Sequence, residues 1–210
     1  MEDLKKVFAG KLLGIKAIKL QPNEPFTWAS GWKSPFYCDN RKTLSFHDVR
    51  SFVKLELVHA ILENFPEATA VAGVATGAIA QGMLVADELA LPYVYVRPKP
   101  KDHGMKNQIE GELPAGAKVI VVEDLISTGG SSLKAVAALR EAGFEVVGMV
   151  ASYTYGFPVA EEAFREAGVN LVTLTDYEHV VEKALETGYI KETDVPMLHE
   201  WREDPANWRK

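Results

Sequence analysis

The chain has 210 residues, of which 47% are hydrophobic and 25% are charged, and its formal net charge is -6 at pH 7. This composition argues against disorder, and the length suits one domain with a full core. The acidic balance argues against a chain whose overall field attracts nucleic acid. The single cysteine, Cys38, excludes an intrachain disulfide and a zinc cluster. With no signal-peptide pattern and no apolar run long enough to span a bilayer, we expect a cytoplasmic protein.

The pattern of the N-terminal part of the chain predicts two helices, separated by a segment that prolines interrupt. Apolar residues recur at helical spacing over residues 2–13 and the pattern stops at Gly14. Residues 17–40 contain three prolines and several aromatics, which predicts short strands and turns. A second helix is expected to begin after an N-cap at Ser45 and to end before Pro66.

From residue 70 onward, strand patterns alternate with helical patterns. Strands are expected at residues 70–74, 93–96, 119–122, 145–151 and 169–173, and helices at residues 79–90, 132–142, 159–167 and 177–186. This alternation predicts an α/β fold with a doubly wound, mostly parallel sheet. We divide one compact domain into an N-terminal hood (residues 1–44), an α/β core (residues 45–190) and a C-terminal packing extension (residues 191–210). The extension should bury Trp201, Trp208 or both.

Two acids and a small-residue turn follow the strand expected at residues 119–122. They are Glu123, Asp124, Leu125, Ile126, Ser127, Thr128, Gly129, Gly130 and Ser131. A Gly/Ser/Thr loop at a helix N-terminus gathers backbone N–H groups where the helix dipole favours an anion. An ordinary βα turn is the alternative, and neither a Walker A loop nor a dinucleotide fingerprint is present. The acids lie in the crevice where open α/β sheets bind ligands, so we predict a phosphate cradle whose acids accept ribose hydroxyls.

The cradle resembles the phosphoribosyl diphosphate (PRPP) signature of the type I phosphoribosyltransferases. That signature has apolar residues before two acids, three variable residues, Thr-Gly, one residue, and Ser or Thr, and Glu123 stands where Asp is commoner. The resemblance implies that residues 123–131 bind PRPP and that the sheet has the fold of this family. Ser127 either turns its hydroxyl toward the base or makes a turn hydrogen bond, and both roles stay open.

The hood carries a second pattern, Ser-Gly-x-x-Ser-Pro-x-Tyr-x-Asp-x-Arg. Its fixed residues are Ser30, Gly31, Ser34, Pro35, Tyr37, Asp39 and Arg41. The pattern is similar to the N-terminal segment of the orotate phosphoribosyltransferases, where it lies over the base. The resemblance implies that Tyr37 and Arg41, with Ser127 of the cradle, contact orotate.

Residues 97–116 are charged, contain three prolines and three glycines, and have little apolar content. A loop of this length without secondary structure of its own is typical of a functional lid or a disordered segment. A solvated loop is the alternative. Because its cations follow a strand that should border the cradle, we predict a lid that clamps a diphosphate and excludes water.

The lid contains Lys-Asp-His-Gly at residues 101–104 and Ile-Glu-Gly at residues 109–111. These motifs resemble the mobile catalytic loop of the orotate phosphoribosyltransferases. The resemblance implies that Arg97, Lys101 and His103 bind the diphosphate and that Lys101, His103 and Asp124 are catalytic. It also implies a homodimer in which residues 97–111 complete the neighbouring site.

Three places depart from the family pattern. Pro98 follows Arg97 where many members have lysine, and Thr76 stands where many have lysine in the loop after the first strand. Residues 152–156 lack an arginine that some members aim at the base. These departures suggest a distinct branch with partly different contacts to the base.

The resemblance implies Mg²⁺-dependent transfer of the 5-phosphoribosyl group from PRPP to orotate, giving orotidine 5'-monophosphate and diphosphate. We expect Mg²⁺ to be held through substrate and water, without a direct protein ligand. A phosphoribosyltransferase for a purine base is one alternative, which the hood and lid motifs argue against. A PRPP-sensing regulator is another, but an acidic chain offers no evident nucleic-acid surface. We expect neither nucleic acid nor a membrane as partner.

Overall fold

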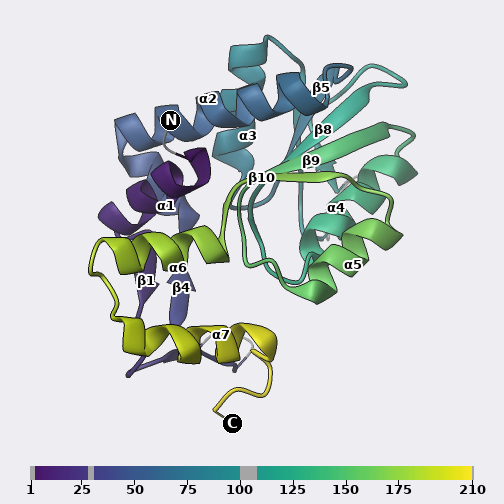
Figure 1. The fold of residues 1–210 in the computed structure, drawn as a ribbon. Helices are drawn as coiled ribbons and strands as arrows, with labels where there is room; N and C mark the ends of the chain where they lie inside the picture. The colour runs from purple at the N-terminus through teal and green to yellow at the C-terminus, as the bar shows by residue number, and fades with distance from the viewer. Residues whose placement is uncertain (1–2, 28–30, 100–107, 210) are drawn as a thin grey trace.

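The structure is a computed structural model that describes residues 3–27, 31–99 and 108–209. A six-stranded sheet in the order β10-β9-β8-β5-β6-β7 forms its centre (Figure 1). The strands are β5 (Ala70–Val74), β6 (Tyr93–Val96), β7 (Ile109–Glu110), β8 (Lys118–Ile126), β9 (Glu145–Thr154) and β10 (Leu171–Asp176). All pairs are parallel except that of β6 with β7. The predicted doubly wound, mostly parallel sheet is therefore confirmed.

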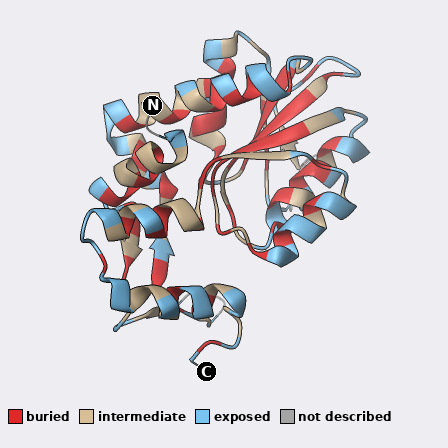
Figure 2. Cartoon of the chain, viewed as in Figure 1, coloured by how far each residue is buried: buried red, intermediate tan, exposed pale blue. Residues whose placement is uncertain are grey.

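Helices cover both faces of the sheet. The helices are α1 (Leu4–Gly14), α2 (His47–Asn64), α3 (Ile79–Leu89), α4 (Gly130–Glu141), α5 (Pro158–Glu166) and α6 (Tyr177–Glu186). One apolar cluster is shared by α1, α2, α3 and α6, and the other by α4 and α5. In β8, Ile120 and Val122 belong to the first cluster and Val119 and Val121 to the second. Successive residues of a strand point to opposite faces, so a run of apolar residues is buried on both sides (Figure 2).

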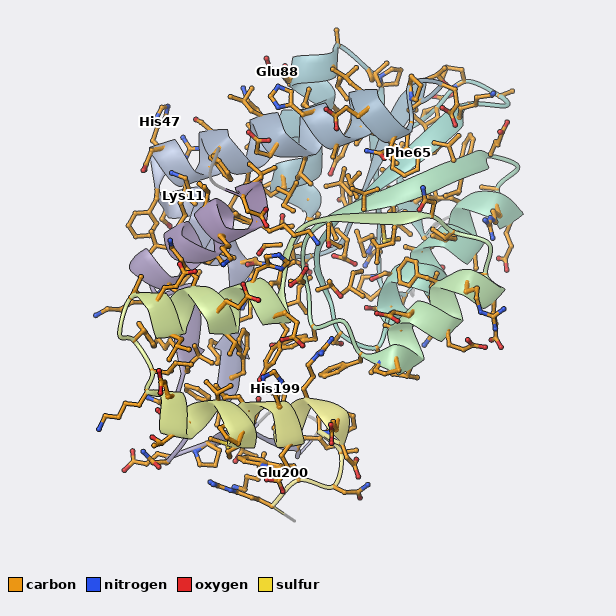
Figure 3. All side chains as sticks on the ribbon, in the orientation of Figure 1. Lys11, His47, Phe65, Glu88, His199 and Glu200 are labelled. Carbon is orange, nitrogen blue, oxygen red and sulfur yellow. The ribbon has the colours of Figure 1, made fainter. Side chains whose placement is uncertain are left out.

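Gly148 of β9 lets an aromatic ring lie directly on the sheet. A Cβ atom at this position would lie 2.1 Å from Cε1 of Phe65. Phe65 follows α2 and is 2% exposed, and Figure 3 shows it between the end of that helix and the strands. The glycine therefore sets how closely the end of α2 approaches the sheet. No helix in the described ranges is long and apolar enough to cross a membrane.

The strand that precedes the cradle is longer than predicted. β8 pairs with β5 only as far as Val122, but its ladder with β9 continues to Ile126. Glu123 and Asp124 therefore lie inside the strand, although acids have low strand propensity. Pairing with β9 outweighs that local preference.

Two other predictions about local structure are wrong. Ser45 does not cap α2, because it ends a 3₁₀ helix, η1 (Asn40–Ser45), and α2 begins after Phe46 without a side-chain cap. The segment 97–116 has secondary structure of its own, because Ile109 and Glu110 form β7 against β6. β7 depends on pairing with β6, a contact distant in sequence that local patterns do not reveal.

Residues 17–40 of the hood form short paired strands, as predicted. β1 (Ile18–Leu20) pairs with β4 (Phe36–Cys38), and β2 (Phe26–Thr27) pairs with β3 (Lys33–Ser34), both antiparallel. After η2 (Glu192–Asp194), helix α7 (Val195–Glu203) lies beside these strands (Figure 1). The C-terminal helix thus packs against the N-terminal segment.

Both tryptophans of the C-terminal segment are buried, which confirms that expectation. Trp201 is 0% and Trp208 is 7% exposed. The indole Nε1 of Trp201 donates to the carbonyl of Lys33 at 3.1 Å. Its ring lies parallel to that of Phe36, with 6.4 Å between the centroids. Trp201 therefore attaches α7 to the hood.

Replacing Trp201 with phenylalanine is expected to lower the melting temperature. The change removes the indole donor and leaves a small cavity, which costs about 1–3 kcal/mol. For a chain of this size each kcal/mol corresponds to about 2–4 °C. Trp208→Phe is the matched control, because it makes the same change near the end of the chain. Thermal unfolding followed by circular dichroism should show the larger shift for Trp201→Phe, and equal shifts would contradict this account.

Candidate active site

The carboxyl ends of β5, β6, β8 and β9 meet at one edge of the sheet. From β5 the chain proceeds through α3 to β6 on one side, and from β8 through α4 to β9 on the other. The crevice between β5 and β8 is therefore a topological switch point, where open α/β sheets bind ligands. The residues beside this crevice are the loop 75–78, Arg97, the two acids and the turn 127–129. The structure thus brings together segments that are far apart in sequence.

The turn after β8 leaves the N-terminus of α4 open. Helix α4 begins at Gly130, after Gly129 at φ +78°, and no side chain caps it. Gly129 is required there, because a Cβ atom would strain this backbone and lie 2.9 Å from Cε2 of Phe164. Thr128, Gly130 and Ser131 are exposed and Ser127 is half-buried. First-turn N–H groups and hydroxyls therefore face solvent, as an anion site requires.

Glu123 is buried and bonded within the protein. It is 4% exposed, its Oε2 accepts from Ser132 Oγ at 2.8 Å, and its Oε1 accepts from the Asp124 N–H at 2.9 Å. Burial, and then the neighbouring Asp124 carboxylate, raise the pKa of Glu123 well above its ordinary range. Glu123 thus joins the end of β8 to the first turn of α4. Ser132 was not among the site residues predicted from the sequence. The signal that could have indicated it is its place in the first turn of the helix.

Replacing Glu123 with glutamine tests this buried carboxyl. Because the folded-state pKa is raised, stability is greatest below the ordinary glutamate pKa and falls as the pH rises through the folded value. Glutamine cannot ionise, so the variant should gain melting temperature relative to the unchanged chain between about pH 5 and pH 8. Each pKa unit corresponds to about 1.4 kcal/mol, or about 3–5 °C.

The control for that experiment is Glu112→Gln, which makes the same change at an exposed glutamate. The difference in melting temperature between this variant and the unchanged chain should be the same at every pH in that range. A constant or narrowing difference for Glu123→Gln, measured by scanning fluorimetry, would show that ionisation of Glu123 does not destabilise the fold.

Asp124 is half-buried and lies against the loop that follows β5. A Cβ atom on Gly77 would lie 2.1 Å from Asp124 Oδ2 and 2.4 Å from its Cγ. Only glycine therefore lets the loop, in which the Ala75–Thr76 peptide bond is cis, approach this carboxylate. Sequence reasoning singled out Thr76 but not Gly77, whose only signal was its place in the short loop that follows a buried strand.

The hood reaches the same crevice. Tyr37 is 38% exposed and its ring centroid lies 5.4 Å from that of Phe26. Arg41 Nε lies 2.7 Å from Asp39 Oδ1, and this carboxylate, with smaller effects of Tyr37 and Asp124, raises the Arg41 pKa. The structure therefore places Tyr37, Arg41 and Asp124 near one another. Ser30 lies outside the described residues.

A cavity of about 250 Å³ separates the cradle from the C-terminal segment. Its lining residues are Trp32, Thr128, Phe157, Pro158, Val159, Arg202, Glu203, Pro205 and Ala206. Most of this lining is apolar, and only Thr128 comes from the cradle. The hood, the cradle and the C-terminal segment thus meet around one space beside the open end of α4.

Two residues of the lid, Arg97 and Gln108, are bonded to each other next to the crevice. The Arg97 N–H donates to the Gln108 carbonyl at 2.8 Å, and Gln108 Nε2 donates back to the Arg97 carbonyl at 2.9 Å. Arg97 Nη1 lies 3.5 Å from Glu110 Oε1. Lys101 and His103 lie outside the described residues, so their roles stay predictions.

Asp124 offers a carboxylate of the kind that a magnesium ion prefers, whereas both carboxyl oxygens of Glu123 are bonded within the protein. Within residues 3–27, 31–99 and 108–209, no group of three or more His, Cys, Asp or Glu side chains could hold a metal. Mg²⁺ commonly binds through one or two carboxylates together with substrate phosphates and water. Asp124 and Glu123 are adjacent carboxyls, and the charge of Asp124 helps to raise the Glu123 pKa. A cation beside Asp124 would relieve that repulsion, so the donor set fits Mg²⁺.

Several known proteins are similar to this chain in sequence and in fold. Residues 56–184 match the phosphoribosyl transferase domain family. Over 208 residues the chain is 70% identical to an orotate phosphoribosyltransferase of Phocaeicola vulgatus, covering 99% of this chain and 98% of the relative. The corresponding protein of Porphyromonas gingivalis is 64% identical and 99% of each chain is covered. These matches include the hood and the C-terminal segment as well as the core.

A solved structure agrees with these sequence matches. The orotate phosphoribosyltransferase of Aeropyrum pernix has a TM-score of 0.77 and 30% identity, covering 88% of this chain and 99% of that chain. The chain therefore belongs to the orotate phosphoribosyltransferases, a branch of the phosphoribosyltransferase family.

Proposed function

We propose that the chain catalyses the Mg²⁺-dependent transfer of the 5-phosphoribosyl group from PRPP to orotate. The products are orotidine 5'-monophosphate and diphosphate, and the step belongs to pyrimidine nucleotide synthesis in the cytoplasm. The observation that carries the proposal is the position of Asp124 in the β5–β8 crevice, between the open N-terminus of α4 and Gly77. The base is assigned from the names of the relatives and from the hood pattern.

The cradle binds the phosphorylated ribose in this proposal. N–H groups of the first turn of α4 and the exposed hydroxyls of Thr128 and Ser131 surround the 5'-phosphate. Asp124 accepts hydrogen bonds from ribose hydroxyls, and its charge favours the positive charge that develops at the anomeric carbon. Glu123, bonded to Ser132 and to the Asp124 N–H, holds the acid and the helix in register.

The hood and the cradle position the second substrate. Orotate is an anion, and the cationic Arg41 offers it a partner beside Tyr37, while Ser127 offers a hydroxyl from the cradle. A ring nitrogen of orotate forms a bond to the anomeric carbon and releases its proton to solvent. At the same time the bond from that carbon to the diphosphate oxygen breaks, and its electron pair stays with the diphosphate. The reacting nitrogen needs little activation, so orientation and charge stabilisation supply most of the rate enhancement.

The lid completes the site in this proposal. Arg97, Lys101 and His103 bind the departing diphosphate, and His103 donates a proton to it. Asp124 would hold Mg²⁺ only through ribose hydroxyls or water, and the ion would neutralise part of the charge on the diphosphate. The lid of one subunit reaches the site of the other in a homodimer, and the bonds between Arg97 and Gln108 fix the point from which it extends.

The assay uses the purified chain with Mg²⁺ and PRPP. Orotate absorbance in the ultraviolet should fall while diphosphate is released, and both should require PRPP. Turnover of hypoxanthine or xanthine with none of orotate would support the purine-base alternative and overturn the assignment of the base.

Mixing two inactive variants tests the proposed homodimer. Lys101→Ala removes a lid cation and Asp124→Asn removes the charge of the cradle acid, so each variant alone should have little activity. If the lid acts across subunits, an equal mixture should regain activity, because hybrid dimers contain one intact site and about a quarter of all sites are intact. A mixture no more active than its components, when subunit exchange is shown by native mass spectrometry, would place the lid and the acid in the same subunit.

A further inference from the structure

Three buried polar side chains connect the hood, helix α3 and strand β8. Asn40 is 5%, Thr43 is 2% and Gln81 is 3% exposed. Gln81 Nε2 donates to Thr43 Oγ1 at 3.2 Å, and Thr43 Oγ1 donates to the Asn40 carbonyl at 2.6 Å. Asn40 Nδ2 donates to the carbonyl of Asp124 at 2.6 Å. These bonds form a continuous path from α3 to the backbone of the cradle acid.

Asn40 takes the place of a missing strand partner. β8 pairs with β5 only to Val122, so the Asp124 carbonyl lies beyond the paired stretch on that side. Cys38 Sγ donates to Asn40 Oδ1 at 3.4 Å, which directs the amide Nδ2 toward Asp124. Burial, with smaller effects of Asp124 and Asp39, raises the pKa of the Cys38 thiol, so it stays a protonated donor.

The other end of the path lies beside the Gly77 loop. Gln81 is in the first turn of α3, which begins directly after this loop, and Gly77 touches the Asp124 carboxylate. The amide oxygen Gln81 Oε1 is buried and has no hydrogen-bond partner among the residues that the structure describes. An unpaired buried acceptor costs free energy that a leucine would not cost. Fold stability therefore does not explain why this side chain is polar.

We propose that Asn40, Thr43 and Gln81 are positioning residues that hold the backbone of Asp124 in register with the Gly77 loop and the hood. The path fixes Asp124 through its carbonyl, and Gly77 limits the carboxylate from the other side. Together they direct the carboxylate toward the ribose of PRPP beneath the hood. This inference rests on the proposed function, because it concerns how the ribose-binding acid is held.

The first test compares two asparagines that make the same kind of bond. Asn40→Ala removes the bond to Asp124, and Asn64→Ala removes a bond from Nδ2 to the Ala60 carbonyl at 2.9 Å at the end of α2. Calorimetric titration with PRPP and Mg²⁺ should show about tenfold weaker binding for Asn40→Ala, which is about 1.4 kcal/mol, and unchanged binding for Asn64→Ala. The KM for PRPP should rise in the same proportion, while the KM for orotate changes less than about twofold.

Two further substitutions separate positioning from fold stability. Thr43→Val keeps the shape and removes the hydroxyl, whereas Thr43→Ser keeps the hydroxyl, so only Thr43→Val should weaken PRPP binding. Gln81→Leu removes the unpaired acceptor together with the bond to Thr43. Its melting temperature should equal or exceed that of the unchanged chain while its PRPP affinity falls several-fold.

The outcomes distinguish this inference from the proposed function. An unchanged chain that binds PRPP but does not use orotate would overturn the proposed base and leave the binding comparison valid. PRPP affinity unaltered in Asn40→Ala, Thr43→Val and Gln81→Leu would overturn the positioning role. Losses of PRPP affinity that parallel the losses of melting temperature, and that are equally large in Asn64→Ala, would also overturn the positioning role. The same conclusion would follow if the unchanged chain did not bind PRPP.

Discussion

Replacing Gly77 with alanine is expected to lower kcat/KM for PRPP by about 100-fold. The added Cβ atom would lie 2.1 Å from Asp124 Oδ2, a separation that non-bonded atoms do not adopt, so the carboxylate or the loop must move. A displacement of about 1 Å is enough for a loss of this size when a group must be oriented toward the reacting centre. The protein should still fold, because the loop lies at the carboxyl end of the strands and can shift there without disturbing the sheet.

Gly14→Ala is the matched control for that substitution. Gly14 ends helix α1, and a Cβ atom there would meet nothing within 4 Å. The control should keep full activity and should be as stable as the unchanged chain or slightly more so, since alanine favours the helix. Steady-state kinetics with varied PRPP and thermal unfolding give both quantities. Full activity of Gly77→Ala would show that the Asp124 carboxylate need not lie where the structure places it.

Replacing Asp124 with asparagine is expected to lower kcat by about 100- to 1000-fold. Asparagine keeps the shape of the side chain but removes the negative charge that favours positive charge at the anomeric carbon. The backbone bonds of Asp124 to Glu123 and Asn40 do not depend on its side chain, so the strand should be retained. The larger effect on kcat than on KM follows because the charge matters most in the transition state.

The control is Asp48→Asn, an identical change at an exposed position in the first turn of α2. There the loss of charge should cost only a few tenths of a kcal/mol of stability and no activity. Kinetics and thermal unfolding of both variants should be measured in the same buffer. If Asp124→Asn loses no more activity than Asp48→Asn, the charge of Asp124 has no role in the reaction.

The linear order of residues was enough to predict most of the strands and helices and the small-residue turn after β8. Four consecutive β-branched residues, 119–122, predict a strand buried on both faces whatever lies beside it, and β8 is such a strand. The turn 127–131 is contiguous, so its glycines and hydroxyls could be located from spacing alone, although α4 begins at Gly130, two residues before the expected start. The hood pattern is likewise a run of neighbouring residues, and it identified the family before any distance was known.

Tertiary structure decided which residues surround the acid. Glu123 and Asp124 are adjacent and chemically alike, yet one is bonded beneath α4 and the other faces the crevice, because successive strand residues point to opposite sides. Gly77 and Asn40 reach Asp124 only because β5 lies next to β8 and the hood folds back over β8. Sequence spacing carries local backbone preferences, whereas these contacts depend on the order of strands in the sheet. The residues of the turn after β8 could therefore be located from the sequence, whereas the contacts that hold and direct Asp124 could not.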